Sequence, residues 1–557
     1  MRKLNKLFLA VIFISSAKFS FAQIDTTKIK PVEIVSSYKP IIREVAKINF
    51  SGSQLPADTN RTVKFYDVPA QNLSYSYKSI SLKPLAYTSD SMVEMGDRNF
   101  VKAGFGNYTT PYLKAGISIG DGSSKLLNVY GDYISSKGKI KYQDFSNLSL
   151  KAAGSYFFSG HEAYSDVSFR NDRYFLYGYD HNLFDFAKQD VLQQFQEMDV
   201  RVGLKNTGEN KLGVKYDPTI RANFFSLKDK VSESSYQFSA PLEKLFGESF
   251  SVKAAAVADL TNYTTKNLTP DNIRLSNNVI KIPVSVSYFS DRFNIHGGIT
   301  PAWDNGQFVY LPDVYADFEL SKKSLVLQAG WVGNINKNTF RNLSLVNPFL
   351  QAFTYQKNTR ETEYYGGIKS SLGKHFSFNA KAGFVTYRNY QLFINDTSSF
   401  ANSKSFLISN ENLLYNFRIH GDASYTVKDK FTASAGVTVN GFTGLTENEK
   451  AWSTVPLEVT ASLRWWIMQK LLLKSDFYLF AGSPYVEKGN IQGRLTGTDL
   501  SAGAEYKINK RFSAFVNLNN IFGNSYERWR NYPVYGFNFL GGVVYRFSSI
   551  LPDKNIQ

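Results

Sequence analysis

The side chains most often used in catalysis and metal binding are few in this sequence and are not arranged for either purpose. The chain has no cysteine, which excludes disulfide bonds and thiolate metal sites. No serine–histidine–aspartate order, glycine-rich phosphate loop or paired-carboxylate motif stands out. The histidines are scattered without the spacing of metal ligands, at positions His161, His181, His296, His375 and His420. The sequence therefore predicts neither an enzyme nor a bound cofactor or metal.

One histidine lies among charged residues. Arg418, His420 and Asp422 are spaced two residues apart within an extended run. Residues two apart along a strand point to the same face of a sheet, so the three side chains are expected to lie together. We interpret them as polar residues of a water-facing surface rather than as a catalytic group.

These charges belong to long runs in which apolar and polar residues alternate. The clearest runs are 415–428, 431–440, 457–468 and 500–509. A period of two residues predicts β-strands with one face in an apolar medium and the other in a polar one. Because buried charges without partners are costly, the charges on the polar faces are predicted to line a wet lumen. They are Arg418, His420, Asp422, Glu458, Arg464, Glu505 and Lys507.

Composition and the last strand pair point to a membrane barrel. The chain has 45 Phe, 35 Tyr and 6 Trp, and aromatic residues form girdles at both membrane interfaces of transmembrane barrels. Trp465 and Trp466, which lie next to a short turn, are interpreted as part of such a girdle. Residues 511–547 contain two alternating runs joined by an aromatic-rich connection, and we expect this hairpin to close the barrel.

Short and long connections take turns along the chain. About ten short turns lie between Asp97 and Phe547, which predicts about 22 strands, or a few fewer, in up-and-down order. The predicted fold is an all-β, antiparallel transmembrane barrel over residues 98–547, with the short turns in the periplasm. The longer connections are expected at the other end, at 171–197, 264–276, 339–361, 396–410, 446–452 and 486–497.

The two ends of the chain differ from this region. Residues 1–22 combine a basic start, an apolar stretch and small residues before Gln23, which predicts a secretory signal peptide. Residues 23–97 contain several prolines and short apolar runs, which indicates an extended segment in the periplasm or the lumen. Residues 548–557 are expected to form a C-terminal tail.

The net charge of +17 does not indicate a nucleic-acid partner. Lys and Arg recur at strand ends and at alternate strand positions, whereas nucleic-acid binding requires a basic cluster. A polar lumen and contact with anionic lipid headgroups account for the charge better.

The closing hairpin carries a motif spread over its two strands and their connection. Its residues are Asn517 to Phe522, Tyr526, Tyr532-Pro533, Gly536, Gly542, Tyr545 and Phe547. This motif resembles the barrel end of TonB-dependent receptors, which are 22-stranded outer-membrane transporters of Gram-negative bacteria. The resemblance implies that the protein is located in the outer membrane and is surrounded by its lipid. It also implies that Tyr545 and Phe547 form the signal read by the barrel-assembly machinery.

The N-terminal segment departs from that family. Family members carry a plug domain of well over a hundred residues ahead of the barrel, and residues 23–97 show no plug-like pattern. Within this segment, Val32, Glu33, Ile34 and Val35 are similar to the short box by which such receptors engage TonB. An ordinary β-prone stretch of an extended arm is the alternative interpretation of the same four residues.

Three functions are open on this evidence. The first is a receptor that transports an unidentified ligand. The second is a non-transporting barrel that scaffolds an envelope-assembly or secretion complex by binding a periplasmic or surface protein. The third is a passive porin. An open barrel of 22 strands would be a wide hole, so we expect its lumen to be filled by the N-terminal segment, inward-folded loops, lumen side chains or a partner protein.

Overall fold

The computed structural model describes residues 99–547, apart from 121–123, 209, 267–271, 322–324, 374, 397–403, 428–429 and 488–490. The predicted signal peptide, the segment 23–97 with its Val32–Val35 motif, and the tail 548–557 lie outside the described residues. Among the described residues, no helix has the length and hydrophobicity needed to cross a bilayer.

The described residues form strands and a short helix. The helix is α2 (Phe340–Val346). The strands are β1 (Asn99–Gly106), β2 (Thr110–Gly120), β3 (Lys125–Ser136), β4 (Phe145–Phe158), β5 (His161–Phe175), β6 (Leu192–Asn206), β7 (Val214–Tyr216), β8 (Thr219–Leu227), β9 (Val231–Phe246), β10 (Phe250–Thr265), β11 (Arg274–Lys281), β12 (Val284–Phe289), β13 (Phe293–Asp304), β14 (Gln307–Ser321), β15 (Leu325–Asn336), β16 (Thr359–Leu372), β17 (Phe376–Asn395), β18 (Phe406–Val427), β19 (Phe431–Thr443), β20 (Leu457–Met468), β21 (Leu471–Glu487), β22 (Ile491–Lys507), β23 (Phe512–Asn519), β24 (Glu527–Trp529), β25 (Tyr532–Pro533) and β26 (Asn538–Phe547).

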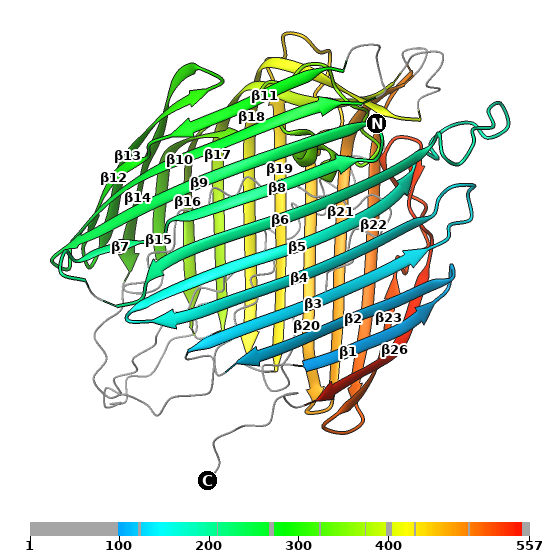
Figure 1. Cartoon of the computed structure of the whole chain (residues 1–557), viewed down its shortest axis with the longest axis horizontal. Helices are drawn as coiled ribbons and strands as arrows, with labels where there is room; N and C mark the ends of the chain where they lie inside the picture. The colour runs from blue at the N-terminus through cyan, green and yellow to red at the C-terminus, as the bar shows by residue number, and fades with distance from the viewer. Residues whose placement is uncertain are drawn as a thin grey trace, which may run out of the picture. The chain divides into compact units, whose positions relative to one another are not determined.

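The main sheet is antiparallel and closes on itself (Figure 1). Apart from two strands that are split in two, each strand pairs with the next along the chain, β23 pairs with β26, and β1 pairs with β2 on one side and with β26 on the other. At the seam, Val101 lies opposite Tyr545 and Gly104 lies opposite Gly542. Closure removes the free edges that an open sheet would expose. The predicted closure of a barrel by the last strand pair is confirmed.

Prolines interrupt two strands without changing the register. β7 and β8 pair with β9 in one continuous register across Asp217-Pro218, and β11 and β12 pair with β10 across Ile282-Pro283. Proline has no N–H group to donate, so the ladder breaks locally at each site. The sheet has 24 segments, and because these four segments make two strands, the barrel has 22 strands. The predicted strand number is confirmed.

Side chains alternate between an exposed outer face and the barrel interior. In β18, Phe417 is 51% exposed and Ile419 is 43% exposed, whereas Asn416 is fully buried and Arg418, between the two exposed residues, is half-buried. Aromatic residues form two belts on the outer face. Near the short turns, the Phe431 ring lies 6.0 Å from that of Tyr425 and 6.2 Å from that of Trp465.

The second belt lies toward the long loops. It includes Trp331 stacked on Tyr364, with centroids 5.5 Å apart, and Phe384 stacked on Tyr415 at 5.6 Å. In β18, Tyr415 in this belt and Tyr425 in the first are separated by roughly 33 Å along the strand, or about 25 Å along the barrel axis at a typical tilt. This spacing matches the apolar band of transmembrane barrels.

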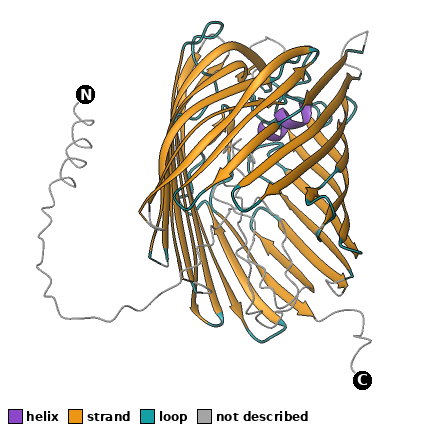
Figure 2. Cartoon of the chain, turned by 90° about the vertical axis from the view of Figure 1, so that its left-hand side faces the viewer, coloured by secondary structure: helices purple, strands orange, loops and turns teal. Residues whose placement is uncertain are grey.

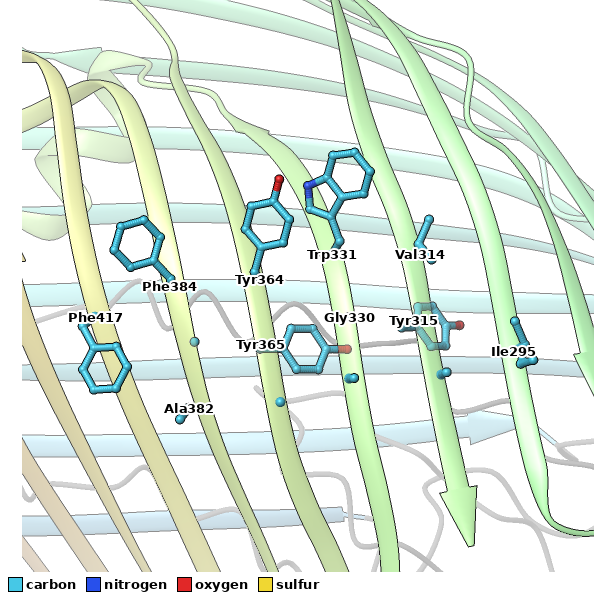
Figure 3. A pocket seen from close by; sticks show the side chains of 14 residues that line it. Ile295, Val314, Tyr315, Gly330, Trp331, Tyr364, Tyr365, Ala382, Phe384 and Phe417 are labelled. Carbon is cyan, nitrogen blue, oxygen red and sulfur yellow. The ribbon is translucent and has the colours of Figure 1, made fainter.

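A shallow hollow of about 580 Å³ lies on the outer wall between these belts (Figure 3). Its floor is a row of small residues on four neighbouring strands, and each residue is paired directly with the next. The row consists of Ala316, Ala329, Gly366 and Ala382. Figure 3 shows Trp331, Tyr364 and Phe384 side by side along one edge of the hollow.

The two ends of the barrel differ in their connections. Most long connections gather at one end, at residues 137–144, 176–191, 337–358, 396–405, 444–456 and 520–537. Among the connections at this end whose residues are all described, those at 107–109, 228–230 and 305–306 are tight. The loop expected at 486–497 is replaced by strand, because β21 runs to Glu487 and β22 starts at Ile491. Because Gly493 and Gly497 have no side chain, the alternation of apolar and polar residues in this part of β22 was not recognisable from the sequence.

Candidate functional site: a three-arm cap over a polar lumen

Three of the long connections fold inward and meet. Arm A is residues 176–191 between β5 and β6, arm B is 337–358 between β15 and β16, and arm C is 520–537 between β23 and β26. Arm B contains α2, which lies within the barrel outline near the loop end in Figure 2. Because the arms start from well-separated strands of the barrel, their meeting point spans the loop end. We call this unit the three-arm cap.

The centre of the cap is aromatic. Tyr177 of arm A, Phe349 of arm B and Tyr532 of arm C have ring centroids 6.0 Å (Tyr177–Phe349), 4.8 Å (Tyr177–Tyr532) and 3.4 Å (Phe349–Tyr532) apart. Their exposed fractions are 2%, 0% and 1%. Tyr177 Oη also donates a hydrogen bond of 2.9 Å to the carbonyl of Pro533. Each arm therefore contributes one buried ring to a single cluster, so that loss of any ring weakens contacts to both other arms.

Close approach at the centre requires a glycine. A Cβ atom on Gly178 would lie 2.5 Å from a ring carbon of Tyr532, which is closer than side chains tolerate. Burial raises the pKa of Tyr177 and of Tyr532 well above 10.0, so both hydroxyls remain protonated donors across the physiological range. Tyr532 donates to the carbonyl of Lys404, and this contact ties arm C to the β17–β18 loop.

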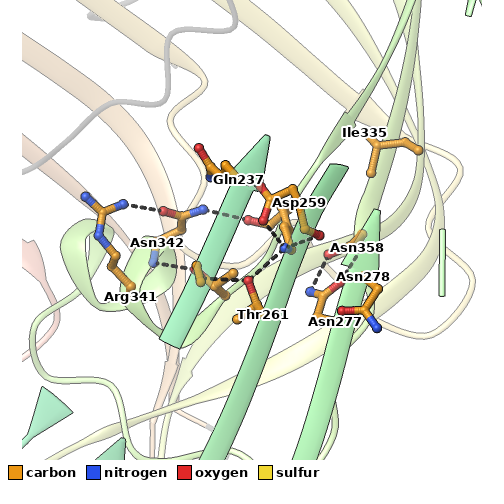
Figure 4. Close-up of polar contacts among 12 residues, drawn as sticks. Gln237, Asp259, Thr261, Asn277, Asn278, Ile335, Arg341, Asn342 and Asn358 are labelled. Carbon is orange, nitrogen blue, oxygen red and sulfur yellow. Dashed lines mark hydrogen bonds and ion pairs between the residues drawn. The ribbon is translucent and has the colours of Figure 1, made fainter. Parts of the chain in front are cut away.

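Arm B is held to the barrel wall by charged groups (Figure 4). Lys337 Nζ contacts the carboxylate of Asp259, donates to its carbonyl oxygen at 2.9 Å and donates to Thr261 Oγ1 at 2.7 Å. Arg341 Nε donates to Glu197 Oε1 at 2.6 Å. Desolvation lowers the pKa of Lys337 below 10.5, and the nearby Asp259 opposes that shift. The buried charges are thus paired, as a stable interior requires.

The start of α2 receives a buried carboxylate. Glu233 of β9 is 2% exposed and accepts hydrogen bonds from the backbone N–H groups of Phe340 at 2.7 Å and Arg341 at 3.2 Å. Thr339 Oγ1 accepts from the N–H of Asn342 at 3.1 Å. The first N–H groups of a helix have no partner within the helix, and here the barrel wall and the N-cap residue supply acceptors. This arrangement fixes where arm B sits on the wall.

Arm C is fastened to the opposite side of the rim. Arg530 forms ion pairs of 3.1 Å with Glu487 at the end of β21 and with Glu527 of its own arm. Arg528 Nη2 donates to the carbonyl of Ser453 at 3.0 Å. Gln143 of the β3–β4 loop donates to the carbonyl of Pro533 at 3.0 Å. The cap is therefore supported from several sectors of the rim and not by the arm roots alone.

The charges predicted to face the lumen lie on the inner wall, and three of them come together. Arg418 Nη2 lies 3.5 Å from Glu361 and Nη1 lies 3.8 Å from Glu363. His420 Nε2 lies 3.5 Å from Asp422, and its Nδ1 lies 2.9 Å from Thr438 Oγ1. The alternation within β18 therefore places its three polar residues in one row of paired groups.

The remaining predicted lumen residues have other partners. Arg464 Nη2 lies 3.0 Å from both carboxylate oxygens of Asp476. Glu458 accepts from Tyr478 Oη at 3.1 Å. Glu505 pairs with Arg546 at 2.6 Å. These contacts link neighbouring strands, and Glu458 also interacts electrostatically with His420 of the Arg418 row.

The predicted girdle and closing-signal residues lie on different faces. Trp465 faces outward and is 42% exposed, within the aromatic belt near the short turns. Trp466 faces the interior, where Lys507 Nζ lies 4.5 Å above its ring. Tyr545 and Phe547 stack at 5.7 Å on the outer face of β26 beside the seam.

A serine–histidine–aspartate row on the inner wall is not evident from the sequence. Ser287 Oγ lies 2.8 Å from His296 Nδ1, and His296 Nε2 lies 2.9 Å from Asp313 Oδ2. The residues come from β12, β13 and β14, and the imidazole stacks on Tyr315 at 4.3 Å. Acyl transfer needs an accessible nucleophile and donors for an oxyanion. Ser287 is 4% exposed, and the neighbouring amides lie within the sheet ladder. The row fits a link between strands better than a catalytic triad.

Comparisons with known proteins agree on the fold. No protein-family model matches the sequence, and no curated protein does. Among solved structures, the FrpB iron transporter from Neisseria meningitidis has a TM-score of 0.62 at 12% identity, covering 81% of this chain and 82% of that chain. The copper transporter OprC has a TM-score of 0.59 at 13% identity, covering 81% and 80%. The ferric-catecholate import receptor Fiu from Escherichia coli K12 has a TM-score of 0.59 at 10% identity, covering 81% and 82%. At these identities the likeness establishes the barrel fold that this chain shares with outer-membrane transporters.

Proposed function

We propose that this protein is an outer-membrane receptor that transports an unidentified ligand in a TonB-dependent manner, with the three-arm cap as its gate. The observation that carries the proposal is the cap itself. It spans the loop end of a closed 22-strand barrel through buried contacts among arms from three sectors. The solved barrels of similar fold include iron and copper transporters, which supports transport as the role.

The cap argues against a passive porin. A porin needs a water-filled passage at both ends, whereas Tyr177, Phe349 and Tyr532 occupy the centre of the loop end with exposed fractions of 2% or less. Each such ring buries on the order of 150–250 Å² of surface. Separating the arms exposes that surface to water, so the closed arrangement is the resting state. Transport then requires the arms to separate when ligand binds.

The test uses the periplasmic domain of TonB as a purified probe. Ile34→Pro in the full-length protein removes a backbone donor from the Val32–Val35 motif, which would prevent strand-type pairing with a partner. We expect the wild type to bind the TonB domain in isothermal titration calorimetry and the Ile34→Pro variant to lose that binding. Ile41→Pro, in the same segment but outside the motif, is the matched control and should bind normally.

Two outcomes would contradict the proposal. Equal binding by both proline variants would mean that the motif does not contact TonB. Absence of binding by the wild type, together with co-purification of a stoichiometric envelope protein, would favour the scaffold function instead.

A further inference from the structure

Two arginines face each other on the outer wall near the loop end. Arg360 of β16 and Arg388 of β17 are directly paired across the two strands, on the face that also carries Tyr364 and Phe384. Neither guanidinium forms a hydrogen bond or an ion pair with any described residue, and Arg360 Nε is buried without a partner. The carboxylate of Asp304 attracts Arg360 electrostatically, but it accepts a hydrogen bond of 2.6 Å from Asn358 instead.

Such a pair is unfavourable in isolation. Side chains directly opposite in antiparallel strands have Cβ atoms about 5 Å apart, and like charges at that distance destabilise the strand pair. An anion between the two guanidinium groups would remove the repulsion and accept charge-assisted hydrogen bonds from their accessible N–H groups. Arginine is also suited to phosphate, because its planar donors match two phosphate oxygens.

The outer face of these strands changes in a regular order toward the loop end. In β16 the outward residues are Gly366, Tyr364, Thr362 and Arg360, and in β17 they are Ala382, Phe384, Thr386 and Arg388. Both series pass from small and apolar through aromatic and hydroxyl to cationic. Aromatic residues mark the interface of a membrane with water, so the arginines lie at the level of lipid headgroups.

The hollow of the outer wall involves the same face of β16 and β17 as the arginine pair, farther from the loop end. Tyr364, at its edge, is roughly 13 Å from Arg360 along β16, and Gly366 of the floor is roughly 20 Å away. An acyl chain attached to a phosphate between the arginines would reach the floor at that depth. The hollow is lined by apolar side chains, which suits hydrocarbon.

We propose that the outer wall formed by β14–β18 binds a phosphorylated acyl lipid of the outer leaflet. The phosphate lies between Arg360 and Arg388, and an acyl chain occupies the hollow floored by Ala329, Gly366 and Ala382. The assignment rests on the outer-membrane placement proposed above, but not on TonB engagement or on transport.

The experiment measures lipid binding to the delipidated full-length protein by native mass spectrometry. The probes are bisphosphorylated lipid A, the same lipid without phosphates, and inorganic phosphate alone. We expect Arg360→Gln/Arg388→Gln to weaken lipid A binding by at least about tenfold, because charge-assisted hydrogen bonds are lost. Gly366→Leu should also weaken it, since the new side chain fills the floor where a Cβ meets no atom within 4 Å.

The control is Arg173→Gln/Arg274→Gln, which removes two outward arginines at the loop end from β5 and β11. This variant should bind lipid A as the wild type does. Equal losses in both double variants, or full binding by Arg360→Gln/Arg388→Gln, would overturn the proposal. So would inorganic phosphate binding as tightly as the lipid, or dephosphorylated lipid binding as tightly as lipid A. Membrane fractionation distinguishes failure of the lipid site from failure of the proposed function. A protein absent from the outer membrane would contradict both proposals, whereas the binding results above concern the lipid site alone.

Discussion

Phe349→Ala should open the three-arm cap without unfolding the barrel. Phe349 is fully buried and stacks on Tyr532 with ring centroids 3.4 Å apart. Truncating a buried phenylalanine to alanine costs roughly 3–5 kcal/mol. Loops held by a local cluster open independently of the strands below them, so we assign this cost to cap opening. A cost of about 4 kcal/mol raises the open fraction roughly a thousandfold.

The absence of cysteine makes a clean reporter available. Ser344 in α2 is 3% exposed, so a thiol at Ser344→Cys is reached by a maleimide only after arm B moves away. When the cap recloses faster than the reagent reacts, the labelling rate follows the open fraction. We therefore expect labelling of Ser344→Cys to rise roughly a thousandfold in the Phe349→Ala background, up to the rate of an exposed thiol.

Two controls fix the interpretation. Tyr355→Cys, at a position of arm B that is 58% exposed, should be labelled at the same rate with and without Phe349→Ala. Phe417→Ala removes a phenylalanine of the same size from the outer wall, where it is 51% exposed, and should leave Ser344→Cys labelling unchanged. The barrel's folded state is checked by its heat-modifiable mobility in gel electrophoresis. If the barrel is folded and the labelling rate of Ser344→Cys rises less than about tenfold in Phe349→Ala, the aromatic centre is not what holds the cap closed.

Two more predictions concern the same cap. Gly178→Ala places a Cβ 2.5 Å from the Tyr532 ring, and overpacking of about 1–3 kcal/mol should raise Ser344→Cys labelling roughly 5-fold to 150-fold. Gly366→Ala should not raise it, and equal labelling in both variants would contradict the steric argument. Desolvation lowers the pKa of Lys337 in the closed cap below its ordinary value of 10.5. Between the lowered pKa and 10.5 the unfolded arm therefore binds more protons than the closed cap, so the stability of the cap should rise with pH across that window. Labelling should therefore slow toward pH 10.5 in the wild type relative to Lys337→Met, and a ratio that is constant with pH would count against it.

The sequence was sufficient for the barrel because strand information is local. A period of two residues separates Phe417 and Ile419 on the outer face from Arg418 on the inner face, whichever strand lies alongside. The same local rule brought Arg418, His420 and Asp422 together. The prediction of an outer girdle was wrong for Trp466, because adjacent residues of a strand point to opposite faces, and Trp466, next to the outward Trp465, faces the lumen.

The cap could not be predicted in this way. Tyr177, Phe349 and Tyr532 lie in irregular loops with no shared period, and their contacts depend on which strands are neighbours on the closed barrel. The Ser287–His296–Asp313 row had a similar obstacle, because its residues meet only through the register of three strands. A faint signal existed in the aromatic content of residues 174–186 and 526–535, which exceeds what connecting loops require.

The hydrogen bond from Tyr177 to Pro533 joins positions 356 residues apart. Contacts of such separation form late in folding, because loop-closure entropy opposes them until the intervening chain is ordered. Pairing of β1 with β26 shortens that path, since around the closed ring only β26 and β1–β5 lie between the β23–β26 and β5–β6 connections. The cap therefore assembles after the seam closes. A closed cap therefore forms only on a completed barrel. In a barrel whose seam is still open, the three arms stay apart and are accessible to the proteases and chaperones of the cell.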